Sequence, residues 1–146
     1  MAFNYLEHQL ALGRVIKFIA SRGYSVSFSS NTYYVVKAEQ TVYAPKRYKN
    51  SCTCICALLH EAGHIVLNSS ILLQARYSNK RNKAVIIEQE YLAWSEGLNI
   101  AKHLYIATPA FTQFYIKEWI SNWSSYIEIH KPATLDSLIA AYQEDI

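Results

Sequence analysis

Two histidines and a glutamate in the stretch His60-Glu61-Ala62-Gly63-His64 form an HExxH pattern, and these residue types at this spacing can do chemistry. On an α-helix, residues four positions apart share a face with Cβ atoms roughly 5–6 Å apart, so both imidazoles can bind one metal ion. Glu61 would lie beside that ion without binding it. Zinc on nitrogen ligands acidifies a bound water, whose proton a nearby carboxylate can take. The pattern therefore predicts metal-assisted hydrolysis.

The pattern has this meaning only on a helix, and its surroundings favour one. Eight apolar residues give the composition of a buried helix: Ile55, Ala57, Leu58, Leu59, Ala62, Ile65, Val66 and Leu67. Ser51 is a predicted N-cap and Asn68 a predicted end of this helix. The alternative is a pair of core histidines that hydrogen-bond without a metal. Burying two imidazoles and a carboxylate together without one would be costly, which argues against it.

The composition is that of one globular domain. Of the 146 residues, 51% are apolar and 17% are charged, which argues against disorder. The first residues lack the order of a signal peptide, and no apolar run is long enough to span a bilayer. Three cysteines within residues 52–56 fit a reducing compartment, so we expect a cytoplasmic protein without a membrane partner. The basic clusters at 46–49 and 76–83 are interpreted as solvated loops, not as a nucleic-acid site.

The elements that must position the motif predict an α+β fold. A capping-box pattern at Asn4 and Glu7 opens a helix over residues 4–22, and Gly23 ends it. Alternating side chains and turn residues then predict three strands of a small antiparallel sheet, at 24–28, 33–37 and 41–44. Val42 to Ala44 is expected at an edge of this sheet, where an extended peptide could add by main-chain hydrogen bonds.

After the HExxH helix the sequence is mostly helical. Residues 69–83 are predicted as a loop with a helical turn at 71–77. Three further helices are predicted: one over 84–103, one that opens at Thr108-Pro109, and a short one over 134–142. His8 and His130 are expected to be surface or capping residues. No repeat or linker indicates a second domain.

A catalytic zinc takes three protein ligands, and the helix over 84–103 offers Glu88 and Glu90. Two residues turn a helix by about 200°, so only one of these carboxylates can face the metal. The face of Glu90 continues with small residues suited to close helix packing: Ala93, Gly97 and Ala101. This favours Glu90 as the ligand and leaves Glu88 and Glu96 on a solvated face. Cys52 and Cys56 precede His60 on its face, but they are expected to be buried thiols and not ligands.

The order Glu90-x-x-Ala93, which begins 26 residues after His64, resembles the third-ligand helix of gluzincin metallopeptidases. The short chain, the helix followed by strands and the HExGH form most resemble the ImmA/IrrE-like metallopeptidases, many of them phage or mobile-element proteins. The resemblance covers roughly residues 5 to 105. It implies a zincin-like fold with Zn²⁺ on His60, His64 and Glu90, and with Glu61 as the general base.

The chain departs from this family directly after Ala93. Trp94, Glu96 and Gly97 stand where the family has an Asn-x-Phe-Ala continuation. This departure concerns the expected substrate class more than the expected metal binding. Amide hydrolysis also needs a donor for the developing oxyanion. The candidates by proximity in sequence are Tyr77, Tyr91 and His103.

The leading interpretation is a zinc metallopeptidase that hydrolyses peptide bonds of a protein substrate. The alternative is a catalytically silent, zinc-stabilised protein-binding module, for example a phage-type inhibitor of a host regulator or defence protein. Aromatic residues of the last third could then form its interface: Phe111, Phe114, Tyr115, Trp119 and Trp123. The same residues could instead cover the core. The sequence does not indicate an oligomeric state.

Overall fold

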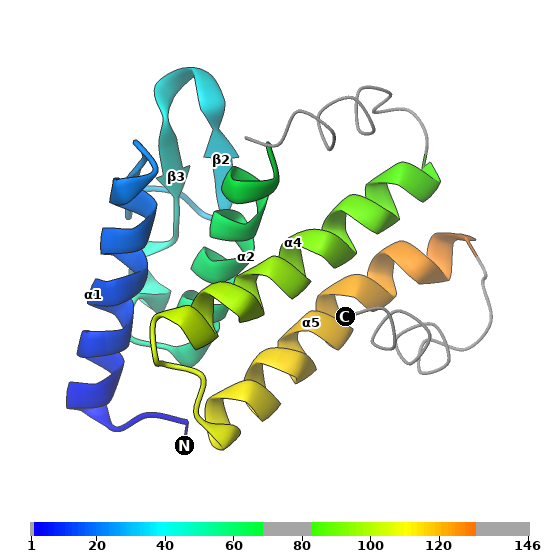
Figure 1. The fold of residues 1–146 in the computed structure, drawn as a ribbon. Helices are drawn as coiled ribbons and strands as arrows, with labels where there is room; N and C mark the ends of the chain where they lie inside the picture. Colours follow the sequence, from blue (N-terminus) through cyan, green and yellow to red (C-terminus); the bar gives the residue numbers. More distant parts are fainter. Residues whose placement is uncertain (1, 69–82, 131–146) are drawn as a thin grey trace.

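The computed structural model describes residues 2–68 and 83–130. This part of the chain has four α-helices and a three-stranded sheet, so the expected α+β class is confirmed for it (Figure 1). The predicted turn at 71–77 and the predicted helix at 134–142 lie outside the described residues.

Helix α1 spans Tyr5–Ser21 and begins with the predicted capping box. The Asn4 side chain accepts a hydrogen bond from the Glu7 backbone N–H at 2.8 Å, and the Glu7 carboxylate accepts one from the Asn4 N–H at 2.9 Å. Beyond the helix, Gly23 has a φ of +85°, a conformation that favours glycine. His8 was expected at the surface or in a cap, but it is buried on the inner face, with Nε2 3.0 Å from the Lys49 carbonyl oxygen.

The sheet is mixed, so the expectation of a wholly antiparallel sheet is wrong. Its strands are β1 (Ser25–Ser27), β2 (Tyr34–Val36) and β3 (Thr41–Tyr43), in the spatial order β1-β3-β2. β3 pairs with β2 antiparallel and with β1 parallel. Alternation along a strand predicts which side chains share a face, but it does not predict which strands are neighbours. Inserting β3 between the other two strands buries Val42 completely.

The strand order also moves the free edge of the sheet. β3 is paired on both sides, so the edge expected at Val42 to Ala44 does not exist. Within the described residues, β2 is the edge strand on the side of helix α2 (Figure 1).

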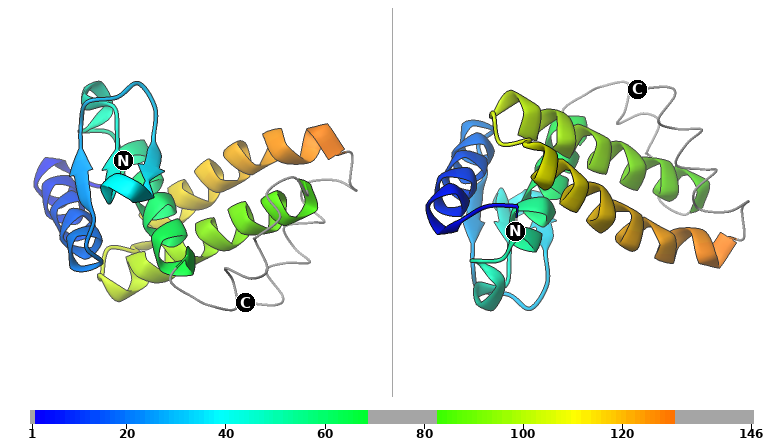
Figure 2. Two further views of the ribbon diagram at one scale, coloured as in Figure 1. Left: turned by 90° about the horizontal axis from the view of Figure 1, so that it is seen from above. Right: turned by 90° about the horizontal axis from the view of Figure 1, so that it is seen from below.

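The 3₁₀ turns η1 (Lys37–Glu39) and η2 (Lys46–Tyr48) flank β3, and three long helices follow: α2 (Cys52–Asn68), α4 (Lys83–His103) and α5 (Pro109–His130). Two predicted caps are confirmed. Ser51 Oγ lies 3.4 Å from the Cys54 backbone N, and Thr108 Oγ1 accepts from the Phe111 N–H at 3.2 Å. α4 and α5 lie side by side and extend away from α1 in both views of Figure 2. None of the helices in the described ranges is both long and apolar enough to cross a membrane.

Helices α2 and α4 touch through their backbones, because glycines occupy the contact points. A Cβ atom on Gly63 would lie 2.9 Å from the Ala93 carbonyl carbon, and one on Gly97 would lie 2.8 Å from the Leu59 carbonyl oxygen. Such distances are shorter than ordinary van der Waals contacts. Ala93 is fully buried, as is Ala101. The predicted packing of the small-residue face of α4 is therefore confirmed.

The aromatic residues in the first three turns of α5, from Phe111 to Trp119, cover the core. Phe111 and Tyr115 are fully buried and Trp119 is 3% exposed. The Tyr115 ring packs edge-on against Trp94 of α4, with centroids 5.3 Å apart, and its hydroxyl donates to the Trp94 carbonyl oxygen. Phe114 is partly buried against the same core. Buried rings of this kind do not form an exposed interface, so the covering role is the one observed for them.

We expect Gly63→Ala to lower the free energy of unfolding by about 1–3 kcal/mol, because the new methyl group would force α2 and α4 apart. Gly13→Ala on α1 is a matched control, since a Cβ there meets no atom within 4 Å. That control should stabilise the protein by about 0.5–1 kcal/mol, as alanine does in an open helical position. Denaturant unfolding followed by circular dichroism measures both changes. Equal effects of the two substitutions would contradict the close packing of α2 and α4.

Candidate metal centre

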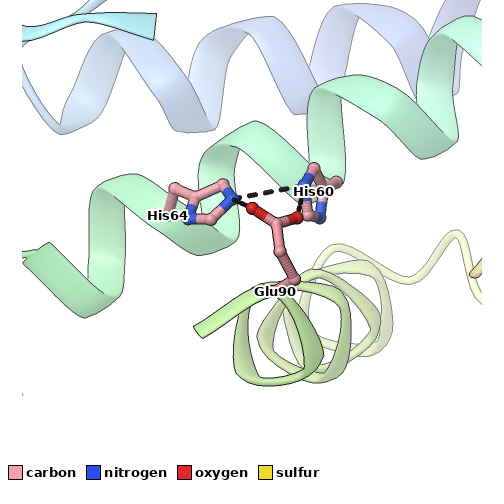
Figure 3. A group of neighbouring side chains, drawn as sticks. All are labelled: His60, His64 and Glu90. Atoms are coloured by element: carbon pink, nitrogen blue, oxygen red, sulfur yellow. Dashed lines mark hydrogen bonds and ion pairs between the residues drawn. The ribbon is translucent and has the colours of Figure 1, made fainter. Parts of the chain in front are cut away.

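Three side chains from two helices converge at one point of the structure. His60 and His64 project from α2, and the Glu90 carboxylate projects from α4 between the two imidazoles (Figure 3). His60 Nε2 lies 3.0 Å from Glu90 Oε2, and His64 Nε2 lies 3.3 Å from Glu90 Oε1. The two Nε2 atoms are 3.2 Å apart. The possible ligand atoms all lie within 4.8 Å of one another, close enough to bind one metal ion.

Local structure and helix packing position this group together. The spacing of four residues places both imidazoles on one face of α2. Gly63, between them in sequence, lets the α4 backbone approach at Ala93. Glu90 lies one helical turn before Ala93, so the same approach carries its carboxylate to both histidines. Glu88 is not part of the group, which agrees with the preference for Glu90.

The group opens into a cavity of about 630 Å³. Four elements and the residues next to them line it: Tyr33, Tyr34, Val35 and Lys37 at β2, Thr53, Ala57, His60, Glu61 and His64 on α2, Glu90 and Trp94 on α4, and Glu118 and Asn122 on α5. A ligand in this cavity can therefore reach the imidazoles and the edge strand at once.

Glu61 also lines the cavity, although its side chain is only 8% exposed. Burial raises the pKa of this carboxyl group, and the charge of Glu90 adds to the increase, while His60 and His64 oppose it. A carboxylate with a raised pKa is a better proton acceptor at neutral pH than an exposed one. Its position beside the histidines and outside the ligand group is the one predicted for a general base.

The Glu90 carboxylate and the His64 imidazole stabilise each other's charged forms. Burial alone would raise the pKa of Glu90, but hydrogen bonds from the two histidines hold it at about 2. Burial likewise disfavours the charged form of His64, yet the hydrogen bond to Glu90 and the charge of Glu90 raise the pKa of this histidine above its usual value. Glu90 is therefore ionised at neutral pH and ready to bind a cation.

Trp94 stacks on His60 from α4, with ring centroids 4.4 Å apart and an interplanar angle of 29°. His60 Nδ1 is buried, and no side chain or backbone group of the described residues hydrogen-bonds to it. Ring stacking on Trp94 thus supports this imidazole, while its Nε2 faces Glu90. Trp94 is one of the residues at which the sequence departs from the family it resembles, and here it contacts a candidate ligand directly.

Several residues considered from the sequence lie elsewhere. The cysteines and Glu96 are outside the metal-binding group and do not line the cavity. Of the predicted oxyanion donors, Tyr91 is buried outside the cavity lining, His103 is exposed at the end of α4, and Tyr77 lies outside the described residues.

The sequence reasoning did not identify the polar residues that β2 and α5 contribute to the cavity. These are Tyr33, Tyr34, Lys37, Glu118 and Asn122. Their place depends on which elements pack together, and no local pattern marks it. Glu118 and Asn122 do share the spacing of four residues that puts two side chains on one helix face, which is the one signal they carry.

We expect the protein to bind one divalent ion per chain, with Zn²⁺ the best fit. Replacing His60, His64 or Glu90 with alanine should weaken binding by more than about 100-fold, because even changes beyond the direct ligands cost 10- to 100-fold. Competition with a chromogenic chelator measures the affinity. Glu88→Gln serves as the control and should bind as tightly as the wild type. Loss of binding in Glu88→Gln but not in Glu90→Ala would reverse the assignment.

Metal affinity should also fall as the pH is lowered. A histidine must be neutral to bind a metal, and the pKa of His64 is raised, so protons compete at a higher pH than for a free histidine. Glu90, with a pKa of about 2, stays ionised over the whole range and adds no dependence of its own. The affinity should fall at least about tenfold per pH unit below the His64 pKa. Calorimetric titrations between pH 5 and 8 test this, and a constant affinity over that range would contradict it.

No protein-family model matches this chain, and no curated protein or solved structure matches it either. The site is therefore described from its own residues. Two imidazoles and one carboxylate lie close enough to bind a metal ion, at the wall of a cavity that also contains a buried glutamate.

Proposed function

We propose that this protein is a zinc-dependent peptidase, with Zn²⁺ bound by His60, His64 and Glu90 and with Glu61 as the general base. The observation that carries the proposal is the convergence of the three ligand groups at a cavity that Glu61 also lines. Two imidazole nitrogens and a carboxylate oxygen form a ligand set typical of catalytic zinc.

The openness of the centre favours a catalytic over a structural metal. Structural zinc sites are closed by four protein ligands, whereas catalytic sites have three and leave a position for water or substrate. Within the described residues the group contains three possible ligands and faces the cavity. A buried carboxylate beside such a group serves no evident purpose in a structural site, but a hydrolase needs one.

Bound zinc would supply a Lewis acid that polarises the scissile carbonyl group and acidifies the attacking water. The chain's own residues do the rest. Glu61 accepts the proton of the water and returns it to the amide nitrogen as that bond breaks. Glu90 and the histidines would hold the ion, and Trp94 keeps the His60 ring in place. Tyr34, Lys37 and Asn122 are polar residues of the cavity lining that can donate hydrogen bonds.

β2 is the strand at which we propose that a peptide binds. It is the edge strand on the side of α2 within the described part of the sheet, and Tyr34, Val35 and the adjacent Lys37 line the cavity. A peptide that adds to this edge by main-chain hydrogen bonds would lie along the cavity beside α2. This replaces the edge expected at β3, which is paired on both sides.

The arrangement of elements is consistent with a zincin-like fold and with the resemblance to the ImmA/IrrE-like peptidases. A helix and a small sheet precede the HExxH helix, and a glutamate helix packs on it through small residues. Membership of that family is part of the proposal.

A polyanionic ligand such as a nucleic acid fits the cavity poorly. Three glutamates line it against one lysine, Lys37, among the described residues. The exposed Lys46, Arg47 and Lys49 lie at η2, outside the cavity lining. The silent binding module stays an alternative prediction, although burial of Phe111, Tyr115 and Trp119 removes most of the interface suggested for it.

Glu61→Gln should retain zinc and lose turnover by about 10²- to 10⁴-fold, because glutamine keeps the size of the side chain but cannot accept the proton. Zinc content is measured by elemental analysis, and cleavage by mass spectrometry of a protein or peptide mixture. Glu96→Gln is the matched control and should cleave as the wild type does. Undiminished cleavage by zinc-loaded Glu61→Gln would rule out this mechanism.

A further inference from the structure

The cavity contains a second polar region near the start of α2, away from the candidate metal ligands. Thr53 and Ala57 line this end, and α5 contributes Glu118 and Asn122 opposite them. The Thr53 hydroxyl donates a hydrogen bond to Glu118 Oε1 at 3.0 Å. This bond joins α2 to α5 and fixes a partly buried carboxylate in the cavity wall.

The charge of this carboxylate is not balanced by a described neighbour. The other two glutamates of the cavity, Glu61 and Glu90, adjoin the histidines and the proposed ion. Among the described side chains, none forms an ion pair with Glu118. This includes Lys37, the one lysine among the described residues that line the cavity. A cationic ligand would therefore find a partly desolvated carboxylate at Glu118.

The distance between Glu118 and the metal centre suits an extended peptide. Thr53, the partner of Glu118, precedes His60 by seven residues and His64 by eleven, or about 10–16 Å along the helix axis. An extended peptide advances about 3.4 Å per residue, so about three to five residues would span this distance.

β2 runs beside α2 from the Glu118 end of the cavity to the metal end. Burial raises the pKa of the Tyr33 hydroxyl at the start of β2, and the nearby Cys54 and Glu118 add to the shift. At the other end, Lys37 directly follows β2 and lines the same cavity as His64. A peptide antiparallel to β2 would therefore run from the metal end toward Glu118. It would place its residues C-terminal to the scissile bond near this carboxylate.

We infer that Glu118 binds an arginine or lysine side chain of the substrate, about three to five residues C-terminal to the cleaved bond. This inference rests on the proposed peptidase function and names the class of peptide that the cavity accepts. Thr53 leaves Glu118 Oε2 available for a charge-assisted hydrogen bond, which is stronger than a neutral one. The aromatic rings of Tyr33 and Tyr34 line the same cavity and can pack against the aliphatic part of the substrate side chain.

The test uses full-length zinc-loaded protein and a library of N-acetylated, C-amidated peptides, so that side chains carry the only charges. Cleavage sites read by mass spectrometry should be enriched in arginine and lysine at the expected distance.

Glu118→Gln, which can still accept a hydrogen bond from Thr53, should lower kcat/KM for an arginine peptide about 10- to 100-fold. The same variant should leave kcat/KM for the matched glutamine peptide unchanged. Glu118→Lys should shift the preference to aspartate and glutamate. Glu96→Gln, outside the cavity, should cleave as the wild type does.

Two outcomes would overturn the inference and leave the peptidase function intact. The wild type could cleave with no basic preference at any position, or Glu118→Gln could retain the preference. A binding measurement tests the role of Glu118 independently of peptide cleavage. The Glu61→Gln protein, loaded with zinc, is incubated with the same peptides displayed on beads. Bound peptides should be rich in arginine and lysine, and the Glu61→Gln/Glu118→Gln double variant should lose this enrichment. That result supports the role of Glu118 even if no peptide is cut, and the absence of basic enrichment overturns it.

Discussion

The backbone contact between α2 and α4 determines where the candidate metal centre can form. Packed helices usually lie 8–10 Å apart because side chains separate them. Gly63 and Gly97 place no side chain of their own between the helices, and the backbone carbonyl groups of Ala93 and Leu59 approach them closely. At this close approach, the Glu90 carboxylate lies 3.0 Å from His60 Nε2 and 3.3 Å from His64 Nε2. The glycine within the HExGH motif is therefore a packing requirement of the site.

Aromatic residues of the core also connect α5 to the contact between α2 and α4. Gly97 also leaves room for the Tyr115 hydroxyl, which bonds to the Trp94 carbonyl oxygen, and the Tyr115 ring packs on Trp94. The Trp94 ring in turn stacks on His60. A continuous series of packed rings thus connects the centre of the hydrophobic core to a candidate ligand. Side chains held in this way keep their geometry without a metal, which lowers the entropy lost on binding one.

Much of the site could be predicted from the sequence, because it follows from residue spacings within single helices. The helical spacing of His60 and His64 and the small residues that follow Glu90 on its face were sufficient to identify the group that the structure brings together. The strand order was not predictable in this way, since the alternation around Val42 is the same for a central strand and an edge strand. Glu118 was missed for a similar reason. Its place in the cavity depends on how α5 packs against α2, and nothing in the residues around it marks that contact.

The buried Glu61 carboxylate makes the fold less stable. Its pKa is raised mainly by loss of hydration, so holding it ionised in this position opposes folding. A hydrophobic residue of similar size would stabilise the helix face at less cost. Residues that weaken a fold yet occupy a cavity beside a ligand group are typical of active sites, where reactivity and stability conflict. A structural metal centre or a passive binding surface would not need this carboxylate, whereas water activation does.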